Sequence, residues 1–304
     1  MVQGDREARP VAPAINRSGV DAVDRTAPDD PLGGGSVVVT GATGKVGEHV
    51  VRGLRDLGAR VRLAVPNPEA ARARFGAGLD YARLVFGAEE SYGQAFAGAR
   101  ALFLVRPPQV ADVKTKIIPA LAVARAAGIA HVVLLSLQGA ERNPVAPHRH
   151  LEAHLKAHGP AWTFLRPSFF MQNLATTHAA DIRDHDEVWV PAGRGRPGVL
   201  DVRDVAAVAV AALTEPGHRG RAYELTGGEA LSYAEVARVL SRVLGRSIRY
   251  PDPSPLRFWN RMRSRGHPAG YVAVMIALYT ACRLGLAARL TPETERLLGR
   301  APIR

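Results

Sequence analysis

The sequence of 304 residues contains a single cysteine, Cys282. One cysteine excludes a disulfide within the chain, and nothing near it has the spacing of metal ligands. The N-terminus also lacks a basic segment followed by an apolar core, the pattern that marks a secretory signal peptide. These absences predict a protein of the reducing cytoplasm.

A long uninterrupted apolar segment is also missing. The most apolar stretch, residues 271–290, contains Arg283 and Arg289, and its uncharged part is too short to cross a bilayer. We therefore expect a helix that packs against the rest of the fold, and no membrane partner.

Acidic residues are scarcer than basic ones, 28 against 40, which gives a formal net charge of +12. Clustered Lys and Arg would indicate nucleic-acid binding, because such clusters release counterions from phosphates. Here the arginines are scattered through every segment. This distribution argues against nucleic acid as the main partner.

The glycine-rich segment Gly41-Ala-Thr-Gly44-Lys-Val-Gly47 directly follows the apolar residues 37–39. Glycines permit a tight turn and a close approach of the backbone to a pyrophosphate, and amides at the start of the next helix attract the anion. Apolar residues then recur at helical spacing: Val46, Val50, Val51, Leu54 and Leu57. The segment predicts a dinucleotide-binding turn, with a purely structural turn as the alternative.

Predicted strands and helices alternate after residue 35. The expected strands are 36–40, 61–65, 83–86, 101–105, 131–135, 162–165 and 222–225, with helices from 46, from 68, at 91–96 and at 113–127 between them. Alternation with short connections specifies a parallel sheet with helices on both faces. The predicted class is α/β, a doubly wound Rossmann-type sheet with a smaller, mostly helical C-terminal lobe.

Composition suggests the domain boundaries. Residues 1–35 carry mixed charge, several prolines and few large apolar residues, so we expect a disordered tail. Residues 36–304 form the predicted dinucleotide-binding domain, in which residues of about 168–190 and 226–304 contribute a small substrate lobe.

The second half is expected to contain a short strand at 187–190 and a helix capped by Asp204. A capping box of Ser232 and Glu235 predicts the start of a further helix, which Gly245 ends.

Several motifs occur in order along the chain. Besides the glycine turn they are Leu102-Phe-Leu-Val-Arg-Pro-Pro108, Leu134-Leu-Ser-Leu-Gln-Gly-Ala140, Trp162-Thr-Phe-Leu-Arg-Pro-Ser-Phe-Phe-Met-Gln-Asn-Leu174, Asp201-Val-Arg-Asp-Val-Ala206 and Tyr223-Glu-Leu-Thr-Gly227. Together they resemble the NmrA-like atypical short-chain dehydrogenases. The resemblance implies a Rossmann domain with a smaller lobe, NADP or NAD as cofactor, and either reduction of quinones and similar electrophiles or a non-catalytic redox-sensing role.

The resemblance also implies site residues. The expected cofactor contacts are Gly41, Thr43, Gly44, Lys45, Val46, Gly47, Asn67, Val105, Arg106, Pro107, Ser136, Leu137 and Pro167. The expected substrate wall consists of Phe169, Phe170, Met171 and Asn173. Its aromatic and Met side chains have an equally plausible role as core residues.

The chain departs from the family pattern around the adenosine end of the cofactor. Pro66-Asn67 follows the second strand, where a basic residue would favour NADP and an acidic residue would favour NAD. The choice of cofactor stays open, with Arg72 or Arg74 as candidates to reach a phosphate. After the third strand, Gly87-Ala88 replaces a frequent Asp, which puts one adenosine contact in doubt.

The Tyr and Lys four residues apart that most short-chain dehydrogenases use for proton donation are missing. The corresponding helix, 147–158, contains Lys156 but no Tyr. Hydride transfer to a quinone or enone needs less acid assistance, because delocalisation stabilises the developing anion. His148 and Ser136 are the expected catalytic residues, with an exposed helix-start position as the alternative role for His148.

The same helix carries His150, His154 and His158 at four-residue spacing, an arrangement that can bind a transition metal. Leu151 and Leu155 supply the buried face, so the three histidines are expected to point to solvent. No native metal site is predicted.

The sequence thus predicts an NAD(P)H-dependent oxidoreductase that transfers hydride to a quinone or conjugated carbonyl without a Tyr-Lys pair. Two alternatives remain: a non-catalytic sensor of the redox state of the dinucleotide, and an enzyme that reduces or couples an aromatic polyketide quinone in natural-product biosynthesis. The expected partner is a small aromatic or quinone substrate, and a homodimer is one candidate assembly.

Overall fold

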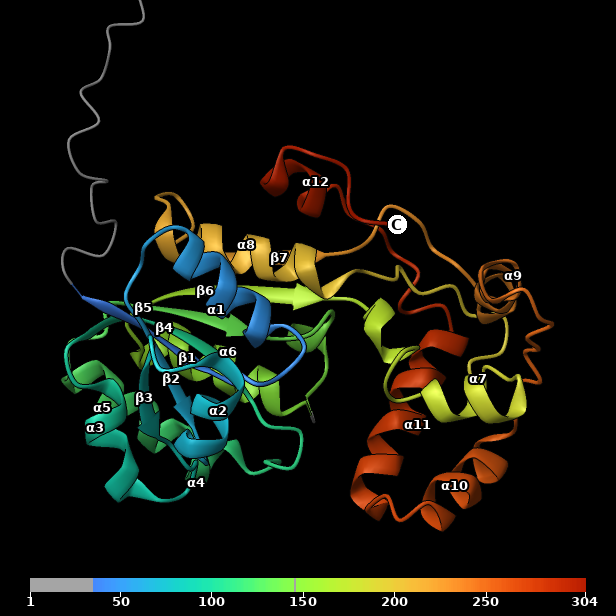
Figure 1. The fold of residues 1–304 in the computed structure, drawn as a ribbon, viewed down its shortest axis with the longest axis horizontal. Helices are drawn as coiled ribbons and strands as arrows, with labels where there is room; N and C mark the ends of the chain where they lie inside the picture. The colour runs from blue at the N-terminus through green and yellow to red at the C-terminus, as the bar shows by residue number, and fades with distance from the viewer. Residues whose placement is uncertain (1–34, 145) are drawn as a thin grey trace, which may run out of the picture. The chain divides into compact units, whose positions relative to one another are not determined.

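The computed structural model of this protein describes residues 35–144 and 146–304, so the predicted tail lies, up to residue 34, outside the described residues. A sheet of parallel strands in the order β3-β2-β1-β4-β5-β6-β7 organises the fold (Figure 1). The strands are β1 (Ser36–Thr40), β2 (Val61–Val65), β3 (Asp80–Arg83), β4 (Ala99–Val105), β5 (His131–Leu135), β6 (Ala161–Pro167) and β7 (Arg221–Leu225). The predicted Rossmann-type α/β class is confirmed.

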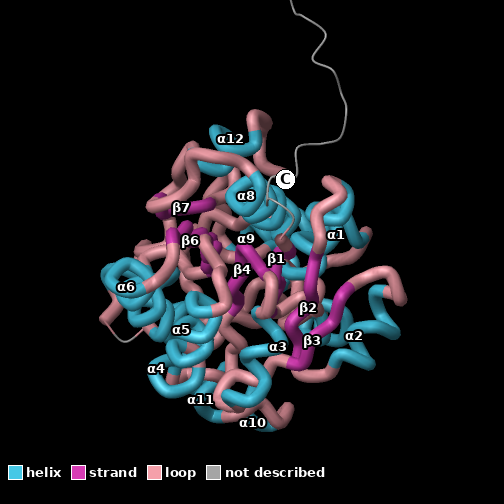
Figure 2. Tube along the Cα trace, turned by 90° about the vertical axis from the view of Figure 1, so that its left-hand side faces the viewer, coloured by secondary structure: helices cyan, strands magenta, loops and turns pink. Residues whose placement is uncertain are grey.

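Helices cover both faces of the sheet (Figure 2). The helices are α1 (Gly47–Asp56), α2 (Pro68–Phe75), α3 (Tyr92–Phe96), α4 (Val113–Lys116), α5 (Ile118–Ala126), α6 (Pro147–His158), α7 (Ala179–His185), α8 (Val202–Thr214), α9 (Tyr233–Leu244), α10 (Pro255–Ser264), α11 (Ala269–Arg283) and α12 (Glu293–Leu298). Short 3₁₀ turns occupy Glu89–Ser91, Ala140–Arg142 and Met171–Asn173. Within the described residues, no helix combines the length and apolar character that a membrane span requires.

The sheet has a core on each face because its strands are apolar on both sides. Val37 and Val39 pack with α1 and α8, whereas Val38 and Leu102 pack with α3, α5 and α6, and all four side chains are fully buried. Parallel strands covered on both faces read as continuous apolar runs, which explains why they were recognisable in the sequence.

A separate core holds together α7, α9, α10 and α11, which we call the helical lobe. Its centre contains Tyr233, Phe258 and Tyr279, whose rings contact one another. In Figure 1 these helices lie together beyond the carboxyl ends of β6 and β7. The lobe therefore stands near the end of the sheet at which Rossmann folds bind their ligands.

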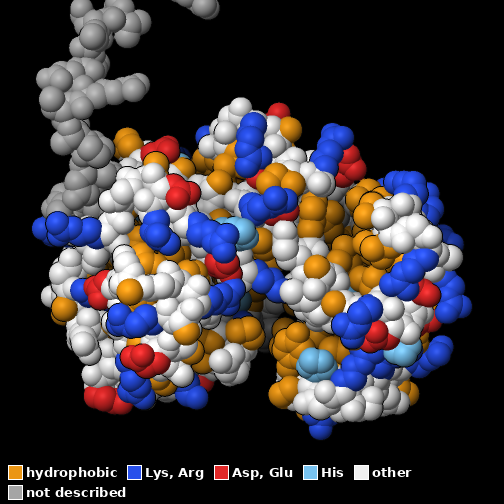
Figure 3. Space-filling view, viewed as in Figure 1, with side chains coloured by type: hydrophobic (Ala, Val, Ile, Leu, Met, Phe, Trp, Pro, Cys, Tyr) orange, Lys and Arg blue, Asp and Glu red, His pale blue; other side chains and the backbone are white. Residues whose placement is uncertain are grey.

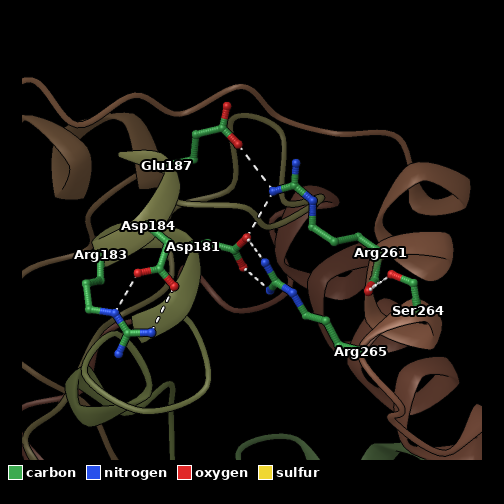
Figure 4. Close-up of polar contacts among 7 residues, drawn as sticks. All are labelled: Asp181, Arg183, Asp184, Glu187, Arg261, Ser264 and Arg265. Carbon is green, nitrogen blue, oxygen red and sulfur yellow. Dashed lines mark hydrogen bonds and ion pairs between the residues drawn. The ribbon is translucent and has the colours of Figure 1, made fainter.

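Buried charge joins α7 to α10 in the helical lobe (Figure 4). The Asp181 carboxylate accepts hydrogen bonds from Arg265 at 2.8 Å and from Arg261 at 2.9 Å, and Arg261 also reaches Glu187 at 3.2 Å. Arg261 lies over the Trp189 ring. We call these four charged residues the lobe ion cluster, which fixes the segment after the substrate wall against the C-terminal helices.

The structure corrects several predicted boundaries. The third strand is Asp80–Arg83 and not 83–86, because its partner β2 ends at Val65, opposite Arg83. The predicted helix 113–127 is two helices, since Pro119 in the first turn of α5 has no amide to donate.

Two further predictions are wrong in the second half of the chain. Residues 187–190 form no strand: they share one isolated bridge, between Glu187 and Arg249, and their apolar side chains are buried among helices. The cap of α8 is Asp201, whose carboxylate accepts from the Arg203 amide, and not Asp204. Asp204 is fully buried and instead accepts from Arg300 and from the Ile303 amide, both at 2.7 Å.

Candidate active site

The glycine turn connects β1 to α1 at the point where the strand order reverses, between β1 and β4. Gly41 has a φ of +60°, and a Cβ there would lie 2.9 Å from Val105. A Cβ on Gly47 would collide with the Gly41 carbonyl. Both positions therefore require glycine for the turn itself.

The outer surface of the turn is open to a ligand. Gly41, Thr43 and Gly44 are exposed, whereas Val46 and Gly47 are buried in the sheet core. A Cβ on Gly44 would meet only the Gly41 carbonyl, 3.1 Å away. An exposed glycine backbone at the start of a helix, where amides point outward, fits the pyrophosphate of a dinucleotide.

The end of β4 is tied to the end of β1. Thr40 Oγ1 accepts a hydrogen bond from the Val105 amide at 2.7 Å and donates to the Phe103 carbonyl at 3.1 Å. This pairing sets Val105 beside Gly41 of the glycine turn, and Arg106 and Pro107 follow it directly in the chain.

Arg106 is bound within its own loop and covers His148. Its Nη1 donates to the carbonyls of Pro107, Pro108 and Val110 at 2.9–3.1 Å. Its Nε donates to His148 Nε2 at 3.5 Å. The guanidinium thus joins the β4–α4 loop to the first turn of α6.

His148 is buried, with 9% of its surface exposed, so the alternative of an exposed helix-start residue is wrong. Burial, and then the nearby charge of Arg106, lowers the pKa of His148 to about 3. Within the described residues, its Nδ1 is buried with no hydrogen-bond partner. Because Nε2 accepts from Arg106, the proton of the neutral ring resides on Nδ1, which leaves an unpaired N–H donor.

Ser136 follows β5 and belongs to a buried polar network. Its hydroxyl donates to Glu152 at 2.6 Å, and Glu152 accepts from Arg166 Nε at 3.0 Å and from Nη2 at 2.5 Å. Sequence reasoning did not assign Glu152 or Arg166 to the site, although Arg166 lies inside one of the quoted motifs. A catalytic role for Ser136 stays a prediction, and it would require the hydroxyl to leave Glu152.

The predicted substrate wall lies between the sheet and the helical lobe. Phe169, Phe170, Met171 and Asn173 are all half-buried, and they border a small cavity of about 10 Å³. Phe170 packs on the sheet core and Phe169 on the lobe core, so both rings also have the core role that was the alternative. This cavity has room for about one water molecule, so a substrate must bind in a larger space.

A side-chain contact connects the glycine turn to this wall. Lys45 Nζ donates to Asn173 Oδ1 at 2.7 Å, and burial lowers the pKa of Lys45. Nearby, Leu137 is half-buried, and the Pro167 carbonyl accepts from the Gln138 amide at 3.0 Å. The structure thus brings predicted cofactor residues and predicted wall residues together.

The three other histidines of α6 have less enclosed positions. His150 and His154 are half-buried and His158 is exposed. Among residues 35–144 and 146–304, no group of three or more His, Cys, Asp or Glu side chains is placed to hold a metal ion.

Comparison with known proteins supports the family resemblance of the sequence motifs. The profile of the NmrA-like family matches residues 34–282. The NAD(P)H azoreductase of Xenophilus azovorans is 34% identical over 270 residues, which cover 87% of this chain and 93% of the relative. The (4-alkanoyl-5-oxo-2,5-dihydrofuran-3-yl)methyl phosphate reductase of Streptomyces griseus is 34% identical over 271 residues, with coverage of 87% and 93%.

A solved structure resembles the fold of this chain over most of its length. The NADPH-dependent quinone oxidoreductase of Escherichia coli, crystallised with NADPH, superposes with a TM-score of 0.80 at 25% identity. The match covers 88% of this chain and 96% of that one. With the glycine turn, the sheet order and the profile match in agreement, the chain belongs to the NmrA-like family.

Proposed function

We propose that this protein is an NAD(P)H-dependent reductase that transfers hydride to a quinone or another conjugated carbonyl. The observation that carries the proposal is the unpaired Nδ1 of His148 in the site formed by the β4–α4 loop and α6. The reductase names of the relatives, two of which specify NAD(P)H or NADPH, support the same class of reaction.

The glycine turn holds the dinucleotide in this proposal. The exposed backbone at Thr43 and Gly44 would bind the pyrophosphate, and the loop at Val105 and Arg106 would hold the ribose. When bound, the reduced nicotinamide supplies the hydride. The protein contributes binding, orientation and a hydrogen bond to the acceptor oxygen.

His148 acts as a neutral hydrogen-bond donor. With a pKa of about 3 the ring carries no charge near pH 7, and its Nδ1–H stabilises negative charge that develops on the substrate oxygen. A neutral imidazole donates its proton reluctantly, so it suits a substrate whose anion is already delocalised. Access to Nδ1 requires the ring to rotate, because Nδ1 is buried and Arg106 contacts the other ring nitrogen, Nε2.

The surroundings favour an apolar substrate. Figure 3 shows hydrophobic side chains over α11, beside the hollow that separates it from the sheet and its helices. On α11, Val274 is 56% exposed and Leu278 is 44% exposed, and Pro268 to Cys282 contain no charged residue. A flat, uncharged ring system is the ligand that such a surface accepts best.

The test is turnover of a panel of quinones and enones with NADPH and NADH, in the wild type and in His148→Gln. We expect His148→Gln to lower kcat about 100-fold, the loss typical of a removed oxyanion donor, with an unchanged Kd for the cofactor. His150→Gln, on the same helix, is the matched control and should keep full activity. Equal activity of His148→Gln and the wild type would contradict this role of His148.

Two other functions predict different outcomes. A redox sensor would bind NADPH and NADP⁺ with different affinities, without turnover of any substrate in the panel. Reduction or coupling of an aromatic polyketide quinone in natural-product biosynthesis predicts a preference for polycyclic aromatic quinones over the small quinones and enones of the panel. The name of the Streptomyces griseus relative describes a dihydrofuranone, so a conjugated lactone belongs in the same panel.

We also propose that the protein is cytoplasmic and forms a homodimer. Cys282 is buried, and burial raises the pKa of its thiol to about 11, so the thiol does not react readily in oxidising or in reducing surroundings.

Light scattering at several protein concentrations would determine the oligomeric state.

A further inference from the structure

The guanidinium of Arg74 lies against the glycine turn, although Arg74 belongs to α2. Its Nη1 donates to the Thr43 carbonyl at 3.0 Å, and its Nη2 forms an ion pair with Glu48 in the first turn of α1. The side chain is 49% exposed. A cation is therefore already positioned at the edge of the surface that fits the dinucleotide.

Pro66 and Asn67, which directly follow β2, carry no charge, and the nearest carboxylate along the chain is Glu69 in the first turn of α2. In Rossmann folds, an Asp or Glu about 20 residues beyond the glycine turn binds the ribose hydroxyls of NAD, whereas a nearby Arg accommodates the 2′-phosphate of NADP. Here the residue is Asn67, which caps α2 by accepting from the Ala70 amide at 3.1 Å. The amide group of Asn67 is neutral, so it leaves room for an anion beside it.

Glu48 does not prevent this role. Its carboxylate also pairs with Arg52 at 2.5 Å, so it keeps a cationic partner when Arg74 turns toward a phosphate. Arg72, two residues earlier on α2, is engaged elsewhere, because its guanidinium lies over the Tyr81 ring at 4.9 Å. Of these two arginines of α2, Arg74 therefore contacts the glycine turn, whereas Arg72 contacts the ring of Tyr81.

We propose that Arg74 binds the 2′-phosphate of NADPH and makes this protein prefer NADPH to NADH. The inference rests on the dinucleotide site proposed above and names the residue that selects between the two cofactors. The Thr43 carbonyl and Glu48 hold the guanidinium near its binding position before the cofactor arrives, which reduces the conformational entropy lost on binding.

The experiment is calorimetric titration with adenosine 2′,5′-bisphosphate and with 5′-AMP, which differ only in the 2′-phosphate and need no turnover. Wild-type protein is expected to bind the bisphosphate about 10- to 100-fold more tightly, the range for charge-assisted hydrogen bonds to a phosphate. Arg74→Gln should remove most of this difference and leave the affinity for 5′-AMP unchanged. Arg74→Lys should restore part of it, and Arg72→Gln is the matched control that should change neither affinity.

Four results would overturn the proposal. Equal wild-type affinity for both nucleotides, or an unchanged ratio in Arg74→Gln, would exclude Arg74 as the selecting residue while the dinucleotide site stands. A parallel loss of both affinities in Arg74→Gln would show that Arg74 only supports the turn. Wild-type protein that binds neither nucleotide would overturn the dinucleotide site together with this inference.

Discussion

The sheet and the helical lobe differ in the mixture of side chains that packs them. Both faces of the sheet are packed mostly by aliphatic residues, such as Val37, Val38 and Leu102, with the rings of Phe103 and Phe164 among them, along strands joined by backbone hydrogen bonds. The lobe is packed by rings, including Tyr233 and Tyr279, and by buried charge. Aliphatic side chains carry no charge, whereas the ion pairs of the lobe stabilise it only while both partners stay charged.

This difference separates two tasks. In the proposed function, the sheet end needs a fixed backbone, because main-chain atoms of the turn would hold the cofactor. The lobe would present side chains to the substrate, and its stability depends on specific polar pairs. Substitutions at the turn should therefore change both cofactor binding and the free energy of unfolding, whereas substitutions in the lobe should change the free energy of unfolding alone.

The largest effect is expected at the turn. Gly47→Ala places a methyl group against the Gly41 carbonyl, so the turn must open, which we expect to lower the free energy of unfolding by about 4 kcal/mol and to abolish dinucleotide binding. Urea denaturation and cofactor titration would measure both. Gly93→Ala, where an added Cβ meets nothing within 4 Å, is the control and should be neutral or slightly stabilising. Cofactor binding by Gly47→Ala at wild-type affinity would refute the role given to the turn.

A smaller effect is expected in the lobe ion cluster. Asp181→Asn removes the carboxylate shared by Arg261 and Arg265, which should lower the free energy of unfolding by about 3 kcal/mol and leave the Kd for NADPH unchanged. Asp184→Asn, an exposed residue paired with Arg183, should cost less than about 0.5 kcal/mol. If Asp181→Asn weakened NADPH binding as strongly as it weakened the fold, the separation of the two regions would be wrong.

The third effect appears only as the pH falls. Burial lowers the pKa of His178 to about 4, and the Tyr279 hydroxyl lies 2.6 Å from its Nε2. Because the unfolded chain takes up the proton near pH 6.5, the contribution of His178 is complete above that pH and decreases as the pH falls toward about 4. The decrease should be at most about 1.4 kcal/mol per pH unit.

Unfolding curves of His178→Gln between pH 7 and pH 4 would measure this dependence. The variant should show a shallower loss of stability than the wild type over this range. His185→Gln, exposed on the same helix, should retain the wild-type slope. Identical slopes in His178→Gln and the wild type would exclude His178 as a source of acid sensitivity.

The sequence predicted most of the sheet because its signals are local. The apolar runs of β1 and β2, the glycines between β1 and α1, and the capping box of Ser232 and Glu235 each involve residues close together in the chain. The run at 187–190 was misassigned because an apolar, β-branched segment buried among helices has the same pattern as a strand.

The site was less predictable because its polar contacts join distant residues. Glu152 accepts hydrogen bonds from Ser136 and from Arg166, which lie in different parts of the chain, and Arg74 reaches Thr43 from the next helix. Asp201 and Asp204 are both suitable helix caps by type, and only the contact of Asp204 with Arg300, 96 residues later, distinguishes them. Contacts between residues so far apart in the chain leave no local pattern in the sequence.

The hydrogen bond between Lys45 and Asn173 limits how this protein can be recombined with its relatives. It joins residues 128 positions apart, one in the glycine turn and one in the substrate wall. A chimera that takes residues up to about 165 from this chain and the remainder from a relative retains the lysine and loses its acceptor unless the relative supplies one at position 173. The half-buried amine would then lack its partner, so the glycine turn and the predicted substrate wall have to be exchanged together.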